Sequence, residues 1–584
     1  MKTWIHPQDP YRMNWIEGVK EWGTVLCPHS LSVTVTQEAR EDGSLTECYI
    51  FRNDSSKDVF TSRTDIGIYT PFNDSYDDPE TCLIHRCHTH IWCGGESSWV
   101  MALRMGACPP HLGLALLAGS LCGYSVERDL SKISNDRGDF ILHPSPLHLA
   151  PGESYTLKWV LFWHQGREDF RSHLQKYGLT PVKADRFVYF SGENVSYDAG
   201  KGRKTLTSPP PGIIGPEEGE AFFRILVLPD LLLLAERRCR FIIKNQQFHA
   251  PQSHLDGAYL IYDNEEGHMY YDARYDYNGG RERVGMGLLL AEFLKRQNRP
   301  GLEASLRKYR TYVCRELVNP STGEVYNDAG RDNAYKRLYN SPWYARFFLE
   351  LYDLWHHEED LDLSLRILDD YYAQGGDRFY AIAIPVQMIL KALSHRKSDQ
   401  YRMERHFVKH AEFLLERGIH YPPHEVNFEQ SIVAPAAVFL LEMYAVTGEE
   451  RYLKGAQEHI RLLDMMNGFQ PDDHLFENSI RHWDGFWFGK RRLYGDTFPH
   501  YWSALTGLAF RLYGRLTRRE EWLKRGENSL RGVLGLYAFA DGAASCAYVY
   551  PLTVNGQNAR GADPYANDQD WGLYFALKEL APLK

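Results

Sequence analysis

The chain has 584 residues and a formal net charge of −10, with 43% hydrophobic and 24% charged residues. These proportions are ordinary for globular proteins and exclude a disordered chain. The length exceeds what one hydrophobic core supports, so we expect two or three domains. The net negative charge excludes a general nucleic-acid-binding role, because phosphate backbones require a broad basic surface.

The N-terminus and the cysteines indicate a cytoplasmic protein. Met1–Pro7 lacks the apolar run of a signal peptide, and no uninterrupted apolar run approaches the roughly 18 residues of a membrane-spanning helix. The ten cysteines fall at irregular spacings, as expected of free thiols in a reducing compartment. The sequence therefore predicts a cytoplasmic protein with neither nucleic-acid nor membrane partners.

The first part of the chain has the pattern of β-strands. Leu31–Thr36 alternates apolar and polar residues, Tyr155–Trp163 reads as a further strand, and no sustained helical period comes before Arg167. Turn residues at short intervals make this an antiparallel β-sandwich. The proline-rich stretch 205–212 then reads as a linker, and Phe222–Val227 as a short strand.

From about residue 281 the pattern is helical. Val284, Leu288 and Ala291 share an apolar face, and Ser341–Pro342 reads as an N-cap followed by proline. Further helical segments begin near residues 302, 360, 378, 399, 428, 449, 499, 517 and 567. The total of about eleven or twelve helices predicts six helical hairpins.

Loop lengths favour a closed ring of these hairpins. Long loops alternate with short turns, at residues 256–281, 319–341, 419–428, 467–499 and 541–567. We expect a sandwich domain with its linker over residues 1–250 and an (α/α)6 barrel over residues 251–584. An open helical solenoid is the alternative, but the chain shows no repeating period of that kind.

The run Arg481–Asp496 is the most informative segment. Its sixteen positions hold four cations, two carboxylates, a histidine and five aromatic residues. Aromatic faces stack on sugar rings, and arginine forks grip carboxylates in a fixed geometry. A long loop of this composition between two helices predicts binding or catalysis, although the same residues could form a solvated loop that packs its own aromatics.

The other long loops repeat this polar and aromatic composition. One carries Arg281–Glu282–Arg283 directly before a helix, where Glu282 is either a catalytic acid or a charge that favours the helix N-terminus. Another carries Asp332–Asn340, a third begins a helix at Glu429, and the last spans Asn555–Trp571. Such loops converging on one rim of a barrel would form a sugar-binding pocket.

A cluster of cysteines and histidines lies between Cys82 and Cys93. It holds enough soft ligands for zinc, but its spacing matches no closed zinc module, and we expect no metal. On a strand, His88 and His90 share one face. They either close the barrel pocket or form hydrogen bonds at a domain interface.

The chain resembles the six-hairpin glycosidase-like superfamily, a β-sandwich followed by an (α/α)6 barrel, over most of its length. Gly280–Met286 and Cys87–Gly95 look most like the rhamnose–glucuronate lyases. The resemblance implies an exo-acting polysaccharide lyase that removes L-rhamnose by β-elimination at an L-rhamnose-α-1,4-D-glucuronate linkage, with a tyrosine as base. The Arg281–Glu282–Arg283 run is also similar to the acid-bearing motif of α-L-rhamnosidases, but it differs in spacing and lacks the following tryptophan.

Lyase and hydrolase chemistry make different demands. A glycosidase needs two carboxylates across the scissile bond. A uronate lyase needs a cation beside the substrate carboxylate and a base for the C5 proton. Arg337 and Arg492 each precede a tyrosine by two positions, and nearby cations lower a tyrosine pKa, which favours the lyase. A glycoside hydrolase of the rhamnosidase or glucuronidase type is the alternative, and a non-catalytic sugar-binding protein is the second.

Residue types assign roles under these readings, and no cofactor is expected. The candidate catalytic residues are Tyr339, Tyr494, His500, Glu282 and Glu429. The candidate substrate-binding residues are Arg283, Arg337, Asn340, Trp343, His482, Trp487, Arg491, Arg492, Asp496, Tyr501, His88 and His90. The base is expected among Tyr339, Tyr494 and Tyr501, with His500 as acid because both of its protonation states are accessible near neutral pH.

Overall fold

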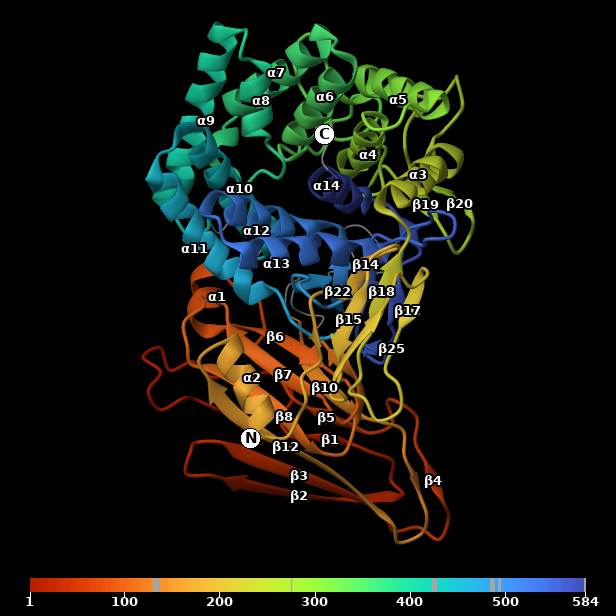
Figure 1. Ribbon diagram of the computed structural model, residues 1–584, viewed down its shortest axis with the longest axis vertical. Coiled ribbons are helices and arrows are strands. Elements are labelled where there is room, and N and C mark those ends of the chain that lie inside the picture. The colour runs from red at the N-terminus through yellow and green to blue at the C-terminus, as the bar shows by residue number, and fades with distance from the viewer. Residues whose placement is uncertain (130–136, 275, 423–427, 484–488, 492–494, 582–584) are drawn as a thin grey trace.

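The computed structural model describes residues 1–129, 137–274, 276–422, 428–483, 489–491 and 495–581, with the backbone alone for 481–483 and 495 (Figure 1). In Figure 1 the red and orange N-terminal strands form the lower half of the molecule, and the green and blue helices form the upper half. The predicted β-sandwich and helical barrel are therefore both present.

Two six-stranded sheets form the sandwich. One is wholly antiparallel, in the order β2 (Leu31–Ala39), β3 (Leu45–Asn53), β12 (Ser154–His164), β8 (His111–Ala118), β7 (Trp99–Arg104) and β6 (Cys87–Trp92). The other has the order β1 (Val25–Leu26), β5 (Gly67–Tyr69), β10 (Asp139–Pro144), β9 (Leu121–Glu127), β24 (Thr553–Val554) and β25 (Gln557–Asn558). Both predicted strands, Leu31–Thr36 and Tyr155–Trp163, are confirmed as parts of β2 and β12.

The two sheets share one apolar core. Tyr49 and Trp159 from the first sheet and Tyr124 and Phe140 from the second are buried in the same cluster. Alternation along each strand produces this arrangement, because side chains at every second position point to the same face. Helix α1 (Pro79–His85) interrupts the expected all-β region, where Asp78 caps its first turn by accepting from the Glu80 and Thr81 amides.

Smaller sheets connect the sandwich to the helices and edge the barrel. Two lie in the connection: β13 (Lys183–Ala184), β15 (Val195–Asp198) and β16 (Arg203–Leu206), then β14 (Val188–Phe190), β18 (Ile225–Leu228) and β17 (Gly212–Ile214). Two lie in barrel loops: β20 (His268–Tyr270), β19 (Ile261–Asp263) and β27 (Tyr565–Ala566), then β21 (Arg481–Trp483), β22 (Gly495–His500), β23 (Ala547–Val549) and β26 (Gly561–Ala562). These last two sheets are formed by the loops of the barrel.

The described part of the barrel contains twelve α-helices. They are α3 (Leu231–Phe241), α4 (Val284–Leu294), α5 (Pro300–Tyr312), α6 (Asn340–Trp355), α7 (Glu358–Ala373), α8 (Val386–Ala392), α9 (Lys397–Arg417), α10 (Gln430–Thr447), α11 (Glu450–Met466), α12 (Ala504–Thr517), α13 (Glu520–Gly532) and α14 (Asp570–Leu580). The starts predicted from apolar periodicity lie close to most of these bounds. Helix α3 begins about 20 residues before the expected start of the helical domain at residue 251.

The helices form a closed double ring. The even-numbered helices α4 to α14 are the inner ring, and the ring closes where α14 packs against α4. Each of α5, α7, α9, α11 and α13 packs outside the inner helix that precedes it, and α3 packs against α4 and α14. Because consecutive hairpins run the same way, all inner helices begin at one end of the barrel, which we call the loop end.

The alternation of loop lengths agrees with the prediction. The inner-to-outer turns are short, such as 356–357 and 448–449, whereas the connections 318–339 and 467–503 lead back to the loop end. Among the described residues, α10 is the one helix long and apolar enough to span a membrane by length and composition. With 61% of its window buried inside the protein, it has the character of a core helix.

The sandwich and the barrel meet along a seam. Loop residues of the barrel, including Phe469, Leu475 and Tyr550, pack into the core of the sandwich. Strand β24 of the last barrel loop pairs with β9 through Val554 and Val126. The sandwich therefore supports the barrel loops from below, and the loop end is built partly on it.

Candidate functional site

Arginines from the segments that precede the inner helices α4 and α6 lie close together at the loop end of the barrel. Arg337 lies just before α6, and its Nη1 is 2.8 Å from Oε1 of Glu282, just before α4. Arg281 pairs with Asp276, and its Nε lies 3.6 Å from Oε2 of Glu282. These residues, together with Arg283, whose Nη2 lies 3.9 Å from Oε2 of Glu282, form what we call the arginine corner, which is largely buried.

The arginine corner holds Glu282 ionised. Burial by itself would raise the pKa of Glu282, but the guanidinium groups of Arg337, Arg281 and Arg283 outweigh it and lower the pKa to about 2. Burial and Arg337 lower the pKa of Arg281 to about 9, which reflects the crowding of positive charge. The corner contains three arginines and two carboxylates, Glu282 and Asp276, so its formal charge is one positive charge in surplus.

Close approach of the backbone explains the glycines before this corner. A Cβ at Gly280 would lie 2.6 Å from the carbonyl oxygen of Asn327, and one at Gly279 would lie 2.5 Å from the hydroxyl of Tyr312. The chain then places Arg281 at a φ of +60°, where side chains are uncommon. Strained backbone of this kind is typical of functional sites.

Arg283 is committed to the protein itself. Its guanidinium donates to the carbonyls of Gly280 and Asp276, at 2.7 Å each, and to Asn567 Oδ1 at 2.6 Å. The side chain is fully buried. These bonds tie the loop before α4 to the loop before α14, so Arg283 supports the corner from behind.

Three tryptophans fill the barrel axis next to the corner. The ring centroids of Trp343 and Trp502 are 5.9 Å apart, those of Trp343 and Trp571 also 5.9 Å, and those of Trp502 and Trp571 5.5 Å. The Trp571 indole donates to the carbonyl of Glu282 at 2.9 Å. The Arg337 guanidinium lies 5.2 Å from the Trp343 ring centroid, so the aromatic cluster and the arginine corner are one unit.

Beyond the tryptophans the axis opens again. A cavity of about 250 Å³ is lined by residues one turn further along the inner helices, including Arg346 and Phe575. Phe575 packs against Trp571 at 5.7 Å. The tryptophans therefore lie between the arginine corner and this cavity.

Tyr501 and His500 enter the loop end from the segment before α12. The Tyr501 hydroxyl interacts electrostatically with both Arg281 and Arg337. The ring of His500 lies 3.9 Å from that of Tyr501, and its Nδ1 accepts the Trp502 amide at 3.2 Å. An acceptor Nδ1 assigns the hydrogen of a neutral imidazole to Nε2, and an imidazolium would lose this bond.

Tyr339, Asn340 and Trp343 come from the start of α6. Tyr339 is half-buried, contacts Phe379 edge-on at 5.4 Å, and lies 5.7 Å from the Arg337 guanidinium. Asn340 donates weakly to Asn327 Oδ1 at 3.3 Å, and its own Oδ1 has no hydrogen-bond partner among the described residues. Helix α6 begins at Asn340, one residue before the predicted cap Ser341.

Glu429 is the N-cap residue of the inner helix α10. It is half-buried, and it accepts a hydrogen bond from the Ser431 hydroxyl. The next residue, Gln430, is fully buried, and neither polar atom of its amide has a hydrogen-bond partner in the described part of the chain. A buried, unsatisfied amide is costly, so Gln430 is an added candidate for a substrate contact.

His88 and His90 lie on β6, the sheet edge that faces the barrel. His90 Nε2 pairs with the carbonyl of Met465 at 2.9 Å, and His88 stacks on Phe428 at 6.1 Å and bonds to the Tyr76 hydroxyl at 3.2 Å. Burial lowers the pKa of His88 to about 3. Both histidines are thus neutral groups of the seam, and His88 reaches the loop before α10.

The remaining predicted residues lie elsewhere or outside the description. Asp496 is buried in the seam, where Arg137 and Tyr124 bind it, and Arg491 is half-exposed and pairs with Glu265 at 3.1 Å. Tyr494, Arg492 and Trp487 lie outside the described residues, and of His482 only the backbone is described. Their predicted roles stay predictions.

Three residues near the corner had no assigned role: Arg281, Trp502 and Trp571. Each directly precedes or begins an inner helix, next to a residue that the sequence did single out. Position at the start of an inner helix was therefore the available signal. What the sequence could not show was which of these helix starts share the axis.

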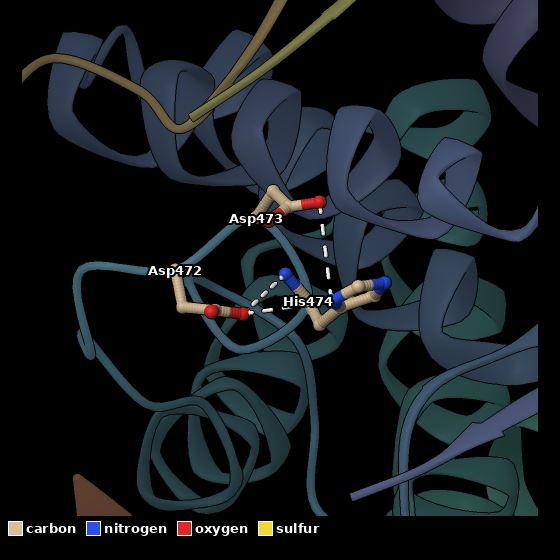
Figure 2. A group of neighbouring side chains, drawn as sticks. All are labelled: Asp472, Asp473 and His474. Atoms are coloured by element: carbon tan, nitrogen blue, oxygen red, sulfur yellow. Dashed lines mark hydrogen bonds and ion pairs between the residues drawn. The ribbon is translucent and has the colours of Figure 1, made fainter. Parts of the chain in front are cut away.

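One further cluster lies in the seam, outside the arginine corner. Among the described residues, Asp472, Asp473 and His474 are the one group of three side chains placed to hold a metal ion (Figure 2). All ten cysteines are free thiols. The Cys82–Cys93 stretch thus forms no such group in the described part of the chain.

A match to a solved enzyme makes this sandwich-plus-barrel protein a carbohydrate-active enzyme. A solved polysaccharide lyase is 33% identical to this chain, covers 100% of it and 99% of its own length, and superposes with a TM-score of 0.93. The chain belongs to the family of that polysaccharide lyase.

More distant structures share less. A family 76 glycoside hydrolase from a bovine Bacteroides thetaiotaomicron strain is 10% identical over 85% of this chain and 99% of its own, with a TM-score of 0.40. A D-mannose isomerase is 12% identical over 61% and 98%, also with a TM-score of 0.40. No family model and no curated protein matches the sequence.

Proposed function

We propose that the protein is a polysaccharide lyase that cleaves its glycan by β-elimination at a uronate. The arginine corner carries the proposal: it has one surplus positive charge, and it holds the carboxyl of Glu282 ionised. An anionic sugar would balance that surplus. The resemblance to rhamnose–glucuronate lyases names the linkage, L-rhamnose-α-1,4-D-glucuronate, with release of terminal L-rhamnose.

The state of Glu282 disfavours a hydrolase that relies on it. A glycosidase acid must carry a proton at working pH, which requires a raised pKa. The arginines lower the pKa of Glu282 to about 2, so this carboxyl has no proton to donate near neutral pH. Glu429 is the other carboxylate among the predicted catalytic residues, and a hydrolytic mechanism could use it.

The corner supplies the first requirement of elimination. Arg281 and Arg337 would pair with the uronate carboxylate and stabilise the negative charge that develops as the C5 proton leaves. Arg337 suits this role because its side chain keeps 24% exposure while Arg281 is nearly buried. Arg283 would hold the loops in place, since its donors are already used within the protein.

Tyr501 is our proposed base. It is the described tyrosine that interacts with both arginines, and such cations favour the phenolate form. The phenolate oxygen takes the C5 proton, the C5–H electron pair becomes the C4–C5 double bond, and the C4–O4 bond breaks. The departing oxygen takes back the proton that Tyr501 has accepted and becomes the anomeric hydroxyl of rhamnose, which regenerates the phenolate.

His500 is placed to assist as a hydrogen-bond donor rather than as an imidazolium acid. Its Nδ1 accepts the Trp502 amide, so the neutral ring presents Nε2–H. Tyr339, beside Arg337, is the second tyrosine available for proton transfer.

The test is the product of a rhamnose-capped glucuronide. Elimination forms a conjugated unsaturated uronate, so ultraviolet absorbance should rise in step with released rhamnose. Equal amounts of rhamnose without that absorbance would identify a hydrolase and overturn the proposal. Saturable binding without either product would identify a sugar-binding protein.

A matched pair of variants separates the two chemistries. Tyr501→Phe should abolish the absorbance change, whereas Glu429→Gln should leave most of it. If Glu429→Gln is the severe change and Tyr501→Phe stays active, a carboxylate mechanism replaces the lyase mechanism. Tyr49→Phe serves as a control, because Tyr49 is a buried tyrosine in the sandwich.

A further inference from the structure

The loop between α11 and β21 carries three adjacent side chains with metal-ligand chemistry. Asp472, Asp473 and His474 each offer a ligand atom, and these atoms all lie within 4.8 Å of one another. Figure 2 shows both carboxylates directed toward His474. All three residues are buried, with 3%, 1% and 4% exposure respectively.

Hydrogen bonds do not satisfy this cluster. Oδ2 of Asp473 and Nδ1 of His474 lack a hydrogen-bond partner among the described residues, where Oδ1 of Asp473 has only its ion pair with Nε of Arg224 at 2.9 Å. His474 Nδ1 lies 3.7 Å from Asp472 Oδ1 and 3.9 Å from Asp473 Oδ2. Buried polar atoms in proteins are almost always partnered, so unpartnered ones that face each other indicate an additional ligand.

Charge points the same way. Arg224 pairs with Asp473 at 2.9 Å, and Arg560 interacts with Asp472. Both carboxylates are buried, where incompletely paired charge is costly, so a cation held between them and His474 would stabilise them.

The histidine is oriented to act as a ligand. Its Nδ1 faces both carboxylates without a hydrogen-bond partner among the described residues, and a neutral imidazole with its hydrogen on Nε2 offers a lone pair there. Its ring stacks on Tyr548 at a centroid distance of 4.1 Å, which fixes its orientation. Two carboxylate oxygens and one imidazole nitrogen are a donor set suited to Zn²⁺, with a fourth position for water.

We propose that Asp472, Asp473 and His474 bind a divalent cation with a preference of the Zn²⁺ type. The site would join the barrel loop to the segment that connects the sandwich to the helices, since Asp472 forms a β-bridge with Arg224, next to β18. This role is structural and independent of the proposed lyase reaction. It also replaces the sequence-based expectation that the protein holds no metal.

Metal content and thermal stability test the proposal without reference to activity. The full chain, purified without chelators or a histidine tag, should retain about one Zn²⁺ per molecule. After treatment with a chelator its Tm should fall, and added Zn²⁺ should restore it in a concentration-dependent way. Ca²⁺ and Mg²⁺ at the same concentration should restore it less, because neither favours an imidazole ligand.

Variants locate the site. His474→Phe keeps a ring against Tyr548 and removes the nitrogen ligand, and Asp473→Asn removes one charge. Each should weaken Zn²⁺ binding at least about tenfold. His410→Phe, a buried histidine on α9, is the matched control and should bind Zn²⁺ as the wild type does.

Two outcomes would overturn the proposal. One is a wild-type protein whose Tm and metal content do not respond to Zn²⁺; the two aspartates would then share a proton instead. The other is Zn²⁺ binding that survives in both His474→Phe and Asp473→Asn. Because the wild-type measurement stands alone, the test holds even if a variant fails to fold.

Discussion

Two buried arginine–carboxylate clusters in this protein look alike in composition and differ in purpose. In the arginine corner, three arginines face Glu282 and Asp276, which leaves a positive charge. In the seam, Arg137 is the one arginine of the described residues that pairs with Asp74 and Asp496. The first cluster has capacity for an anionic ligand, and the second has none.

Geometry confirms the difference. Arg137 grips Asp496 with Nε and Nη2 at 2.7 and 2.8 Å, and Tyr124 adds a third bond at 2.8 Å. Arg137 is fully buried, whereas the side chain of Arg337 is 24% exposed. A buried ion pair therefore does not by itself mark a site, and the corner differs from the seam in its surplus positive charge and in the partly exposed side chain of Arg337.

The largest expected effect sharpens the reading of the arginine corner. Tyr501→Phe should keep the fold and substrate binding and reduce turnover by about 10²–10⁴-fold, because a required general base is lost. The rate of ultraviolet absorbance increase on a rhamnose-capped glucuronide measures it. More than about a tenth of the wild-type rate in both Tyr501→Phe and Tyr339→Phe would leave Tyr494 as the predicted base.

Substitution of Arg137 in the seam should change the stability of the protein and leave its substrate preference unchanged. Arg137→Ala leaves two buried carboxylates without their cation and should lower the free energy of unfolding by about 3–5 kcal/mol. Chemical denaturation of the full chain measures the change. Arg52→Ala, which breaks the exposed pair with Asp54, is the control and should change little. A stable Arg137→Ala protein with altered substrate charge preference would contradict the contrast between the two clusters.

The corner should respond in substrate preference. Arg337→Ala should weaken turnover of a uronate substrate about a hundredfold more than turnover of its carboxyl-reduced analogue, because a charge-assisted pair is lost only with the uronate. The ratio of kcat/KM values for the two substrates measures it. Arg307→Ala on the outer helix α5 is the control, and equal losses on both substrates would make Arg337 structural.

The smallest effect is a pH dependence from Glu282. Its pKa in the folded protein, about 2, lies below the ordinary 4.5, so the folded state favours the ionised form. That contribution to stability is complete above about pH 4.5 and is lost as the pH falls toward 2. The difference in unfolding free energy between wild type and Glu282→Gln should therefore shrink between about pH 6 and pH 3. A constant difference would show that the arginines do not hold Glu282 ionised.

Much of the architecture was predictable, because periodicity reports burial directly. Alternation in Leu31–Thr36 and apolar spacing from Val284 onward predicted strand and helix, and loop lengths predicted which helix ends meet. Helix α3 was missed because it is an outer helix that lies before the long loop 256–281, close to where the helical domain was predicted to begin. Helix α1 was missed because a seven-residue helix has too few turns for a period.

The site was predictable only as a set of candidates. Glu282, Arg337, Tyr339, Asn340, Trp343 and Tyr501 lie at the loop end, as the loop argument expected. Asp496 and Arg283 were candidates because they are also charged loop residues, yet in the structure their polar atoms bind other groups of the protein. A residue's type states what chemistry it can do, and its neighbours decide whether that chemistry is available.

By itself the sequence determined the two architectures, the end of the barrel where chemistry gathers, and the excess of arginine there, because these depend on local pattern and composition. Only the tertiary structure decided that Glu282 is held ionised, that Arg137 closes the seam, and that Asp472, Asp473 and His474 face one another. These properties depend on burial and on distances between groups, some of them hundreds of positions apart in the chain, such as Arg137 and Asp496. Electrostatic energies change with burial and with distance, and the amino-acid sequence states neither of these.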